Sequence, residues 1–215
     1  MRTDAAPPRY NVAPTQPVLA VATRHAHGDG HRFVRALGTF RWGLVPSWAK
    51  DPSVGNRMIN ARAESVATKP AYRSALRSRR CLIPADAFYE WETRSGRKAK
   101  QPWAIRLESG EPMALAGLWE VWRDRTDPDT DPLRTCVIVT TGTNDALSAI
   151  HGRMPVVLSQ DHWDRWLDPS FDDRESLQRM LVPAPADWFA TNAVSTAVNT
   201  VANDGPELLE EISTS

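Results

Sequence analysis

Short runs of β-branched and aromatic residues, separated by proline and glycine, recur along most of this 215-residue chain. The sequence holds 17 prolines and 11 glycines, and residues of these two types interrupt long helices. Such punctuation predicts many short strands joined by turns, with a few short helices between them. We therefore expect an α+β fold, in which one domain over residues 1–215 has a mixed, largely antiparallel sheet or a barrel-like core.

The expected strands follow from runs of apolar and β-branched residues. Residues 137–139, Val-Ile-Val, are typical of a strand that is buried on both faces, which we place at 134–141. The Gly- and His-rich stretch 25–31 predicts a turn. Further strands are expected at residues 18–23, 33–43, 81–83, 88–92, 103–107, 113–122 and 154–158.

The expected helices are few and short. Pro70 favours a helix over residues 71–79, and Asn144 is a suitable N-cap for a second helix over 145–150. Further helices are expected at 161–167 and 175–181. The tail after Gly205 is expected to fray.

The charge balance limits how the chain can bind nucleic acid. Lys plus Arg number 26 and Asp plus Glu also number 26, so no global basic field is present and any DNA contact must be a local patch. No apolar stretch approaches membrane-spanning length, and the chain does not open on a signal-like segment. We expect a cytoplasmic protein, associated with the nucleoid when bound to DNA, with no membrane partner.

Cys81 and Cys136 are expected to be packed thiols. Both lie in apolar strand segments without CxxC spacing, which argues against a disulfide, a metal site or an activated nucleophile. We expect no metal, because His25, His27 and His31 have no other ligand type beside them, and we expect no cofactor.

The basic stretch, which we define as residues 69–80, contains five cations and no acid. Arginine forks suit phosphate oxygens, and Arg73 and Arg77 would share one helical face at i, i+4 spacing. This stretch either contacts DNA or is a solvated helix face balanced by acids elsewhere. Its cations are Lys69, Arg73, Arg77, Arg79 and Arg80.

Several further motifs place polar or aromatic side chains where a ligand could meet them. In an extended segment Asn60, Arg62 and Glu64 would lie on one side, as a pocket wall or as an exposed edge strand. Glu90 stands among three aromatic residues, and burial there would raise its pKa toward neutral and suit it to acid–base chemistry, unless it points to solvent. His151 can exchange protons near neutral pH or can cap a helix.

Trp42 and Trp48 flank a proline-containing turn. Exposed tryptophans would stack on unpaired bases, and buried ones would belong to the core. We expect one of the two to be mostly buried.

The order of these motifs resembles the SOS response-associated peptidase family from residue 9 to about residue 209. The landmarks are Arg9-Tyr-Asn-Val-Ala-Pro14, Trp42-Gly-Leu-Val-Pro-Ser-Trp48, Asn60-Ala-Arg-Ala-Glu64, Arg80-Cys-Leu-Ile-Pro-Ala-Asp-Ala-Phe-Tyr-Glu-Trp91, Ala116-Gly-Leu-Trp119, Thr140-Thr141, Ile150-His-Gly-Arg-Met-Pro-Val156, Val194-Ser195 and Asn203-Asp-Gly205. The resemblance implies the fold of that family and a sensor of abasic sites in single-stranded DNA. In the family, a cysteine directly after the initiator methionine forms a Schiff base with the open aldehyde through its amine, and its thiol closes a thiazolidine. The peptidase activity is then the removal of the protein's own methionine, and the chemistry is thiol-dependent and lyase-like.

The resemblance also implies roles for individual residues. Asn60 would hydrogen-bond the opened sugar, Glu90 would move protons, and His151 would protonate the sugar oxygen or assist reversal. Arg62 and Arg153 match arginines that hold flanking phosphates. The remaining DNA contacts are expected from Trp42, Trp48, Arg73, Arg77 and Arg80. The expected partner is single-stranded DNA with abasic sites, bound by a monomer.

The sequence departs from the family at its start. Position 2 is Arg2, no cysteine precedes Cys81, and only eight residues precede Arg9, so the family's leader is expected to be missing. Either the start is placed too far downstream, which we favour, or the nucleophile is lost. As written, the chain is expected to be inactive in thiazolidine formation. Two alternatives remain: a non-catalytic module that binds single-stranded DNA, and a hydrolase that uses Glu90 and His151 with water but lacks a nucleophile elbow.

Overall fold

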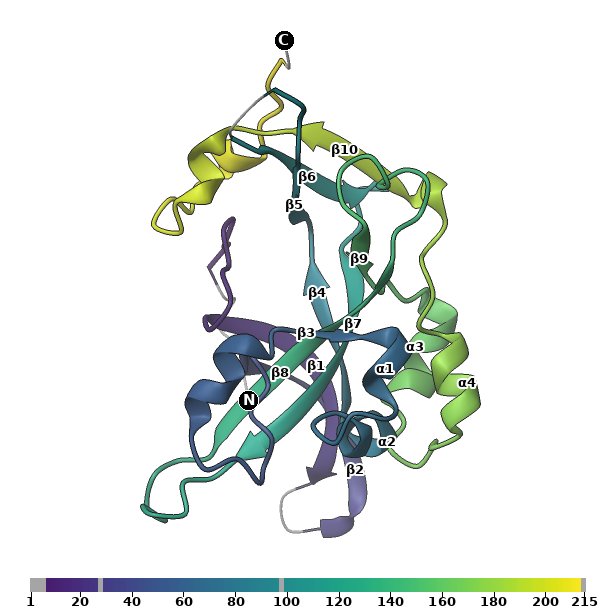
Figure 1. Ribbon diagram of the computed structural model, residues 1–215. Helices are drawn as coiled ribbons and strands as arrows, with labels where there is room; N and C mark the ends of the chain where they lie inside the picture. The colour runs from purple at the N-terminus through teal and green to yellow at the C-terminus, as the bar shows by residue number, and fades with distance from the viewer. Residues whose placement is uncertain (1–6, 27–28, 97–98, 214–215) are drawn as a thin grey trace.

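The computed structural model describes residues 7–26, 29–96 and 99–213, and Figure 1 shows how its elements are arranged. The strands within these ranges are β1 (Pro17–Ala26), β2 (Asp29–Trp42), β3 (Asn60–Arg62), β4 (Arg80–Ala85), β5 (Phe88–Glu92), β6 (Gln101–Leu107), β7 (Met113–Trp122), β8 (Leu133–Gly142), β9 (Arg153–Pro155) and β10 (Phe189–Ala193). The α-helices are α1 (Ala63–Val66), α2 (Arg73–Ser78), α3 (Gln160–Leu167) and α4 (Arg174–Arg179). The 3-10 helices are η1 (Pro52–Arg57), η2 (Ala186–Trp188), η3 (Thr196–Asn199) and η4 (Pro206–Leu209).

Most strands belong to one sheet that closes on itself. Its order is β2-β1-β4-β7-β8-β3, with β9 paired to β8. β2 also pairs with β8 in parallel, at Arg41↔Thr135 and Trp42↔Cys136, so β1, β2, β4, β7 and β8 form a ring. Closure removes exposed strand edges. The predicted α+β class with a mixed, largely antiparallel, barrel-like sheet is therefore confirmed.

The strand β8 is buried on both faces, as its β-branched run predicts. Successive side chains of a strand point to opposite sides. Val137 and Val139 accordingly pack in the core cluster that contains helical residues such as Trp166, whereas Cys136 and Ile138 pack in a second cluster with Phe40. Helices α1 to α4 gather along one side of the sheet, where they cover the first of these faces (Figure 1).

A second antiparallel sheet, β10-β6-β5, lies near the C-terminal end of the chain (Figure 1). Phe88 and Ile105 on one face join the core of the barrel. On the other face, Tyr89 and Trp91 pack against the segment after β10, including Leu208, which is 1% exposed. The prediction that the tail frays after Gly205 is therefore wrong, because η4 anchors it through this apolar contact.

Two predicted elements differ in the structure. Residues 145–150 form turns and not a helix. The amide of Asn144 accepts a hydrogen bond from the Leu147 N–H and donates one to the Ala184 carbonyl, at 3.2 Å and 2.9 Å, and so ties this segment to a distant one. The predicted turn at 25–31 is shorter, since β1 continues to Ala26 and β2 begins at Asp29; residues 27 and 28 lie outside the described residues.

Within the described ranges, no helix has the length and apolar character needed to cross a membrane.

Candidate functional site

Glu90 and His151 form the centre of the candidate site. Glu90 lies in the middle of β5, opposite Trp103 of β6, and its side chain is 22% exposed. One carboxylate oxygen, Oε2, lies 3.4 Å from Nδ1 of His151. Burial raises the pKa of the Glu90 carboxyl, while the nearby charges of His151 and Lys100 act in the opposite direction. Glu90 is thus partly buried, as its interpretation as a carboxyl with a raised pKa requires.

His151 is held at the end of the turns that follow β8. Its backbone N–H donates to the Leu147 carbonyl at 3.0 Å, and its side chain is 46% exposed. Nδ1 also lies 3.0 Å from the Arg153 carbonyl oxygen and 3.3 Å from the Arg153 backbone nitrogen. A protonated Nδ1 can donate to that carbonyl or to Glu90, whereas an unprotonated Nδ1 accepts from the Arg153 N–H. Nε2 remains as the ring nitrogen that can serve a ligand. A carboxyl and an imidazole in this arrangement can move a proton near neutral pH.

Arg153 lies beside this pair and is fixed by two partners. Its guanidinium donates to both carboxylate oxygens of Glu64, at 3.1 Å each, and to the Thr140 carbonyl at 2.7 Å. The hydrogen bonds from Arg153 lower the pKa of Glu64, which therefore remains a carboxylate at neutral pH. These contacts fix the orientation of the guanidinium. A phosphate that binds it must compete with the Glu64 carboxylate for the same N–H donors.

Asn60 and Arg62 lie on β3, which runs parallel to β8 in register Asn60↔Ile138 and Arg62↔Thr140. Both side chains are exposed, while Ala61 between them is fully buried. The predicted polar row is therefore real over residues 60–62. It does not extend to Glu64 as a strand, because α1 begins at Ala63, although Glu64 remains exposed.

These contacts link four of the predicted residues, Arg62, Arg153, His151 and Glu90. Arg62 is opposite Thr140 in the sheet, Thr140 accepts from Arg153, the Arg153 carbonyl meets His151, and His151 meets Glu90. We call this set of residues, together with Asn60 and Glu64, the Glu90 face.

The two predicted tryptophans differ in exposure. The indole N–H of Trp42 donates to the Ile59 carbonyl at 2.8 Å, next to the start of β3, and the ring is half-buried. Trp48 is 59% exposed. Its loop is anchored where Gly43, at φ +133°, touches Gly55; a Cβ on Gly43 would lie 2.5 Å from the Gly55 carbonyl oxygen. Trp48 is thus the side chain of the two that presents its ring to a ligand.

The basic stretch is only partly available. Arg80 was expected to contact DNA, but it is 3% exposed, and its guanidinium donates to backbone carbonyls. Arg77 is exposed and lies 3.2 Å from Asp172, and Arg73 is exposed at the start of α2. The carbonyl partners of Arg80 are Leu76, Arg77, Trp166, Asp168 and Phe171.

The prediction for Arg80 is wrong for a physical reason. The helices α2 and α3 end beside it, and their last carbonyl groups have no partner within the helix. A buried cation at this point satisfies them, and burial lowers the pKa of Arg80 to about 10, which leaves it charged at neutral pH.

Both cysteines are free and fully buried. Burial raises the pKa of the Cys81 thiol well above its usual value and that of Cys136 to about 12. Neither can supply a thiolate, as expected.

Lys100, whose charge acts on Glu90, and Thr140, which holds Arg153, were not predicted as site residues from the sequence. Thr140 did stand among the family landmarks. Lys100 gave no signal, because β5 and β6 bring it near Glu90 only in the folded sheet. The apolar cleft of about 830 Å³ beside α3, lined by residues such as Leu82, Met113 and Trp163, contains none of the predicted site residues.

The family described as "SOS response associated peptidase (SRAP)" matches residues 1–201 of this sequence. The chain belongs to the SRAP family. Among its curated relatives is the abasic site processing protein YoqW of Bacillus subtilis, with 45% identity over 94% of this chain and 86% of the relative. The abasic site processing protein HMCES of Gallus gallus is 34% identical over 95% of this chain and 66% of the relative.

Solved structures share the SRAP architecture. A protein from Bacteroides thetaiotaomicron superposes with a TM-score of 0.74 at 24% identity, over 82% of this chain and 77% of the other, which shows the fold. A phage-related protein from Bordetella bronchiseptica gives a TM-score of 0.64 at 30% identity, over 88% of this chain and 83% of the other.

Proposed function

We propose that this SRAP protein processes abasic sites in single-stranded DNA, with the Glu90 face as its active surface. The observation that carries the proposal is the contact between Glu90 and His151, a half-buried carboxyl and an exposed imidazole 3.4 Å apart, beside an arginine fixed by Glu64. Relatives over nearly the whole chain bear the name of abasic site processing proteins, which supports the same substrate.

The reaction begins with an amine at the amino terminus of the chain. An abasic site is in equilibrium with an open aldehyde, and attack of a neutral amine on the carbonyl carbon gives a carbinolamine. Loss of water from it forms the C=N bond of a Schiff base. An α-amine suits this step better than lysine, since its usual pKa is about 7.7–8.0 compared with about 10.4.

The Glu90 face supplies the protons for these steps. Glu90 takes up and returns the proton that moves between amine and leaving water. His151 gives a proton to the sugar ring oxygen as the ring opens to the aldehyde and takes it back as the ring closes. Asn60 hydrogen-bonds the opened sugar. Arg62 and Arg153 hold the flanking phosphates, and Trp48 stacks on a neighbouring base while Trp42 supports the turn.

The stable end point depends on a thiol next to the amine. A thiazolidine forms when a cysteine thiol adds to the Schiff base carbon, and a cysteine amine with its own thiol is required for that ring. In the sequence given, Arg2 follows Met1 and both cysteines are buried, so a chain that began at this methionine would stop at the reversible Schiff base. Removal of the initiator methionine by the same Glu90 would give the peptidase activity of a chain that carries cysteine there.

The binding partner follows from the shape of the surface. The Glu90 face offers two arginines, Arg62 and Arg153, on a protein of zero net charge, which suits a short single strand with unstacked bases rather than a long duplex. We expect a monomer to bind it, free in the cytoplasm or on the nucleoid. A binding module without chemistry would use the same arginines and Trp48.

The test compares this chain with a cysteine-bearing version, defined as the chain extended by upstream in-frame codons with cysteine after the initiator methionine. Each is incubated with a single-stranded oligonucleotide that holds one abasic site, with and without cyanoborohydride, and run on a denaturing gel. This chain should shift the DNA only with the reductant, and the cysteine-bearing version also without it. If neither shifts the DNA although both bind it in a native gel, the protein is a binding module.

A further inference from the structure

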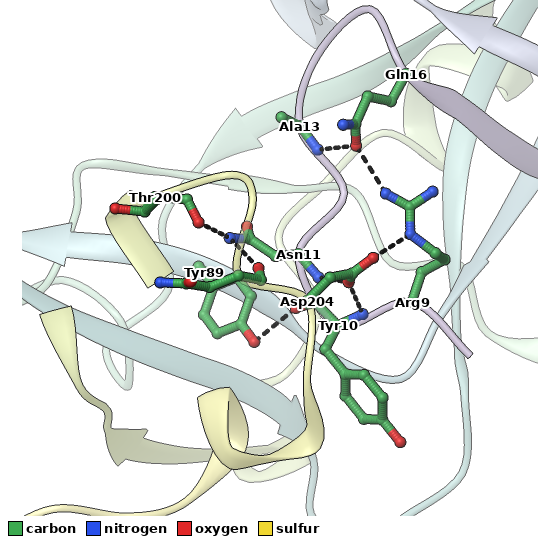
Figure 2. Close-up of polar contacts among 9 residues, drawn as sticks. Arg9, Tyr10, Asn11, Ala13, Gln16, Tyr89, Thr200 and Asp204 are labelled. Atoms are coloured by element: carbon green, nitrogen blue, oxygen red, sulfur yellow. Dashed lines mark hydrogen bonds and ion pairs between the residues drawn. The ribbon is translucent and has the colours of Figure 1, made fainter. Parts of the chain in front are cut away.

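The sheet that contains β5 and β6 has one face that other parts of the chain cover. Tyr89 and Trp91 point to this face, where they pack against the segment after β10. Figure 2 shows polar contacts of this cover: the Tyr89 hydroxyl donates to the Tyr10 carbonyl at 2.9 Å, and the Asp204 carboxylate accepts from the Tyr10 N–H at 2.5 Å. Because successive side chains of a strand point to opposite sides, Glu90 lies on the other face.

That other face places Trp103 directly opposite Glu90. The two residues are paired across β5 and β6, and side chains opposed in this way have Cβ atoms about 4.5–5.5 Å apart. Both are partly buried, and Phe88, the preceding residue of β5 on this face, joins the core of the barrel. The pairing therefore puts a large apolar ring beside the Glu90 carboxyl, whose Oε2 lies 3.4 Å from Nδ1 of His151.

Trp103 is held in one orientation by a carboxylate. Its indole N–H donates to Oε2 of Glu92 at 3.0 Å, and the Arg94 Nε–H donates to the same oxygen at 2.9 Å. Glu92 lies two residues beyond Glu90 on β5, so the indole lies diagonally across the sheet and does not stand away from it. Hydrogen bonds from Arg94 and Trp103 lower the pKa of Glu92, which therefore remains a carboxylate at neutral pH and strengthens its bond to the indole.

On these grounds we propose that Trp103 is a positioning residue, whose indole excludes water from one side of the Glu90 carboxyl and keeps it turned toward His151. This inference rests on the proposed function, in which Glu90 moves protons. A carboxyl shielded in this way is harder to ionise, because desolvation penalises the charged form. It therefore exchanges its proton closer to neutral pH, where a general acid–base group is most effective. A Trp103 that served only the sheet would change stability and leave the titration of Glu90 as it is.

Charged and titratable neighbours also act on Glu90, and they remain when Trp103 is replaced. They are His151 in the turns after β8, Lys100 before β6, the Glu92–Arg94 ion pair along β5, and the Arg153–Glu64 ion pair beside His151. The charges of His151 and Lys100 oppose the effect of burial on the pKa of Glu90. Glu92 keeps its bond from Arg94 and stays ionised without the indole. A change in the titration of Glu90 in a Trp103 variant is therefore due to loss of the ring.

The first readout is the titration of Glu90 itself. The chain is labelled with carbon-13 at the glutamate carboxyls, NMR spectra are recorded across pH, and the Glu90 signal is the one absent from Glu90→Gln. Trp103→Thr removes the ring and keeps a residue suited to a strand. The pKa of Glu90 should be raised in the unaltered chain and should fall toward its ordinary value in Trp103→Thr. Trp103→Phe, which restores an aromatic ring, should restore most of the elevation.

Trp91→Thr is the matched control. It removes the same kind of ring from the residue next to Glu90, but on the covered face of the sheet. It should lower the Tm and leave the titration of Glu90 unchanged. If Trp103→Thr does not fold, Trp103→Val replaces it, and the pKa of Glu90 is expected to fall in the same direction.

The second readout is the rate of adduct formation at saturating abasic single-stranded DNA, for the cysteine-bearing version with and without Trp103→Thr. With a lower pKa, Glu90 is a weaker base and is less often protonated at neutral pH. The rate at neutral pH should therefore fall roughly tenfold, a part of the about 10²–10⁴-fold that a general acid–base group contributes. The limb of the pH–rate profile that reports Glu90 should move to lower pH, and the Kd for DNA should change less than about twofold.

The outcomes separate this inference from the proposed function. If the cysteine-bearing version reacts and the pKa of Glu90 is the same in Trp103→Thr, the positioning role is wrong and the proposed function stands. A lowered pKa with an unchanged rate also overturns the positioning role, and weaker DNA binding with an unchanged titration would make Trp103 a DNA contact instead. If the titration shifts as expected but the cysteine-bearing version forms no adduct, the proposed function fails while the effect of Trp103 on Glu90 stands.

Discussion

Two arginines of this protein, Arg80 and Arg153, were both expected to contact DNA, but the structure places them in opposite environments. Arg80 is 3% exposed and donates to carbonyls at the ends of α2 and α3, so it holds helices together. Arg153 has a side chain that is 28% exposed, and it is held by Glu64 and Thr140 on the face that contains His151. The same fork of donors serves the fold in one place and faces solvent in the other.

The difference shows what decides whether an arginine stabilises the fold or can bind a phosphate. Five backbone carbonyls around Arg80 carry only partial charges, and no phosphate could replace them without unfolding the helix ends. The carboxylate beside Arg153 is a full charge at the surface, which water or a phosphate can replace at modest cost. The partner of the guanidinium, rather than the density of basic residues, indicates a site for DNA.

The largest expected effect comes from Arg80→Ala. It leaves buried carbonyls without donors, and each such group costs about 1–3 kcal/mol, so the free energy of unfolding should fall by at least about 3 kcal/mol. Denaturant unfolding measures this. The exposed Arg73→Ala is the matched control and should change stability by no more than about 0.5 kcal/mol. Equal, small effects of the two substitutions would show that Arg80 does not hold the helix ends.

Arg153→Ala should have the opposite effects, with weaker DNA binding and little change in stability. Loss of a phosphate contact should weaken binding of single-stranded DNA roughly tenfold and reduce the magnitude of the salt slope by about 0.7. The free energy of unfolding should change by less than about 1 kcal/mol, because the pair with Glu64 is half-exposed. Fluorescence anisotropy at several salt concentrations is the measurement. A loss of stability with unchanged DNA affinity would show that Arg153, like Arg80, serves the fold and does not bind DNA.

Glu64→Gln tests whether the carboxylate beside Arg153 competes with phosphate, and its expected effect is smaller. The substitution removes the charge that competes with phosphate, so affinity for single-stranded DNA should rise about two- to threefold at low salt, within the range of exposed ion pairs. The same titrations would check it. A fall in affinity would mean that Glu64 mainly aims Arg153 and that competition is negligible.

The smallest effect concerns the pH dependence of stability. Burial raises the pKa of Glu90, so the folded protein binds more protons there than the unfolded chain, and stability falls as pH rises through that pKa. At pH values above this pKa, Glu90→Gln should therefore raise the Tm by up to roughly 2–4 °C. The gain should vanish at pH below about 4, where Glu90 is protonated in both the folded and the unfolded state. Calorimetry across pH 3–8 measures it.

Glu92 on the same strand is the control with the opposite sign. Hydrogen bonds from Arg94 and Trp103 lower the pKa of Glu92, so Glu92→Gln should lower the Tm at neutral pH and lose that effect as pH falls through the lowered pKa. A gain for Glu92→Gln, or a loss for Glu90→Gln, would contradict the assigned environments of these carboxyls.

Local sequence patterns predicted most strands and the character of the core. The run at 137–139 specified a strand buried on both faces, because β-branched residues without alternation leave no polar side for solvent. Residues 145–150 were mispredicted, because the amide of Asn144 donates a hydrogen bond to the Ala184 carbonyl that no local pattern contains. The tail after Gly205 was mispredicted for the same reason, since Leu208 packs on a distant sheet.

The site residues could be predicted where they belong to motifs whose order along the sequence matches the family. Asn60, Arg62, Glu90, His151 and Arg153 were named from motifs. The structure connects Arg62, Arg153, His151 and Glu90 through strand pairing and side-chain contacts, and Asn60 lies on the same strand as Arg62. Arg80 could not be separated from Arg73 by sequence, because charge does not reveal burial. Asp204 stood in a family landmark, yet its contact with residues 9–11 spans more than 190 positions and needs the fold.

The central claim is that Glu90, beside His151, promotes reaction of the protein's amine with an abasic site. The most direct test is the rate of cyanoborohydride-trapped adduct on abasic single-stranded DNA, for the unaltered chain and for Glu90→Gln, at DNA concentrations that saturate both. We predict that Glu90→Gln reacts about 10²–10⁴ times more slowly with an unchanged Kd, as expected on loss of a general acid–base group. Equal rates for the two proteins would contradict the account.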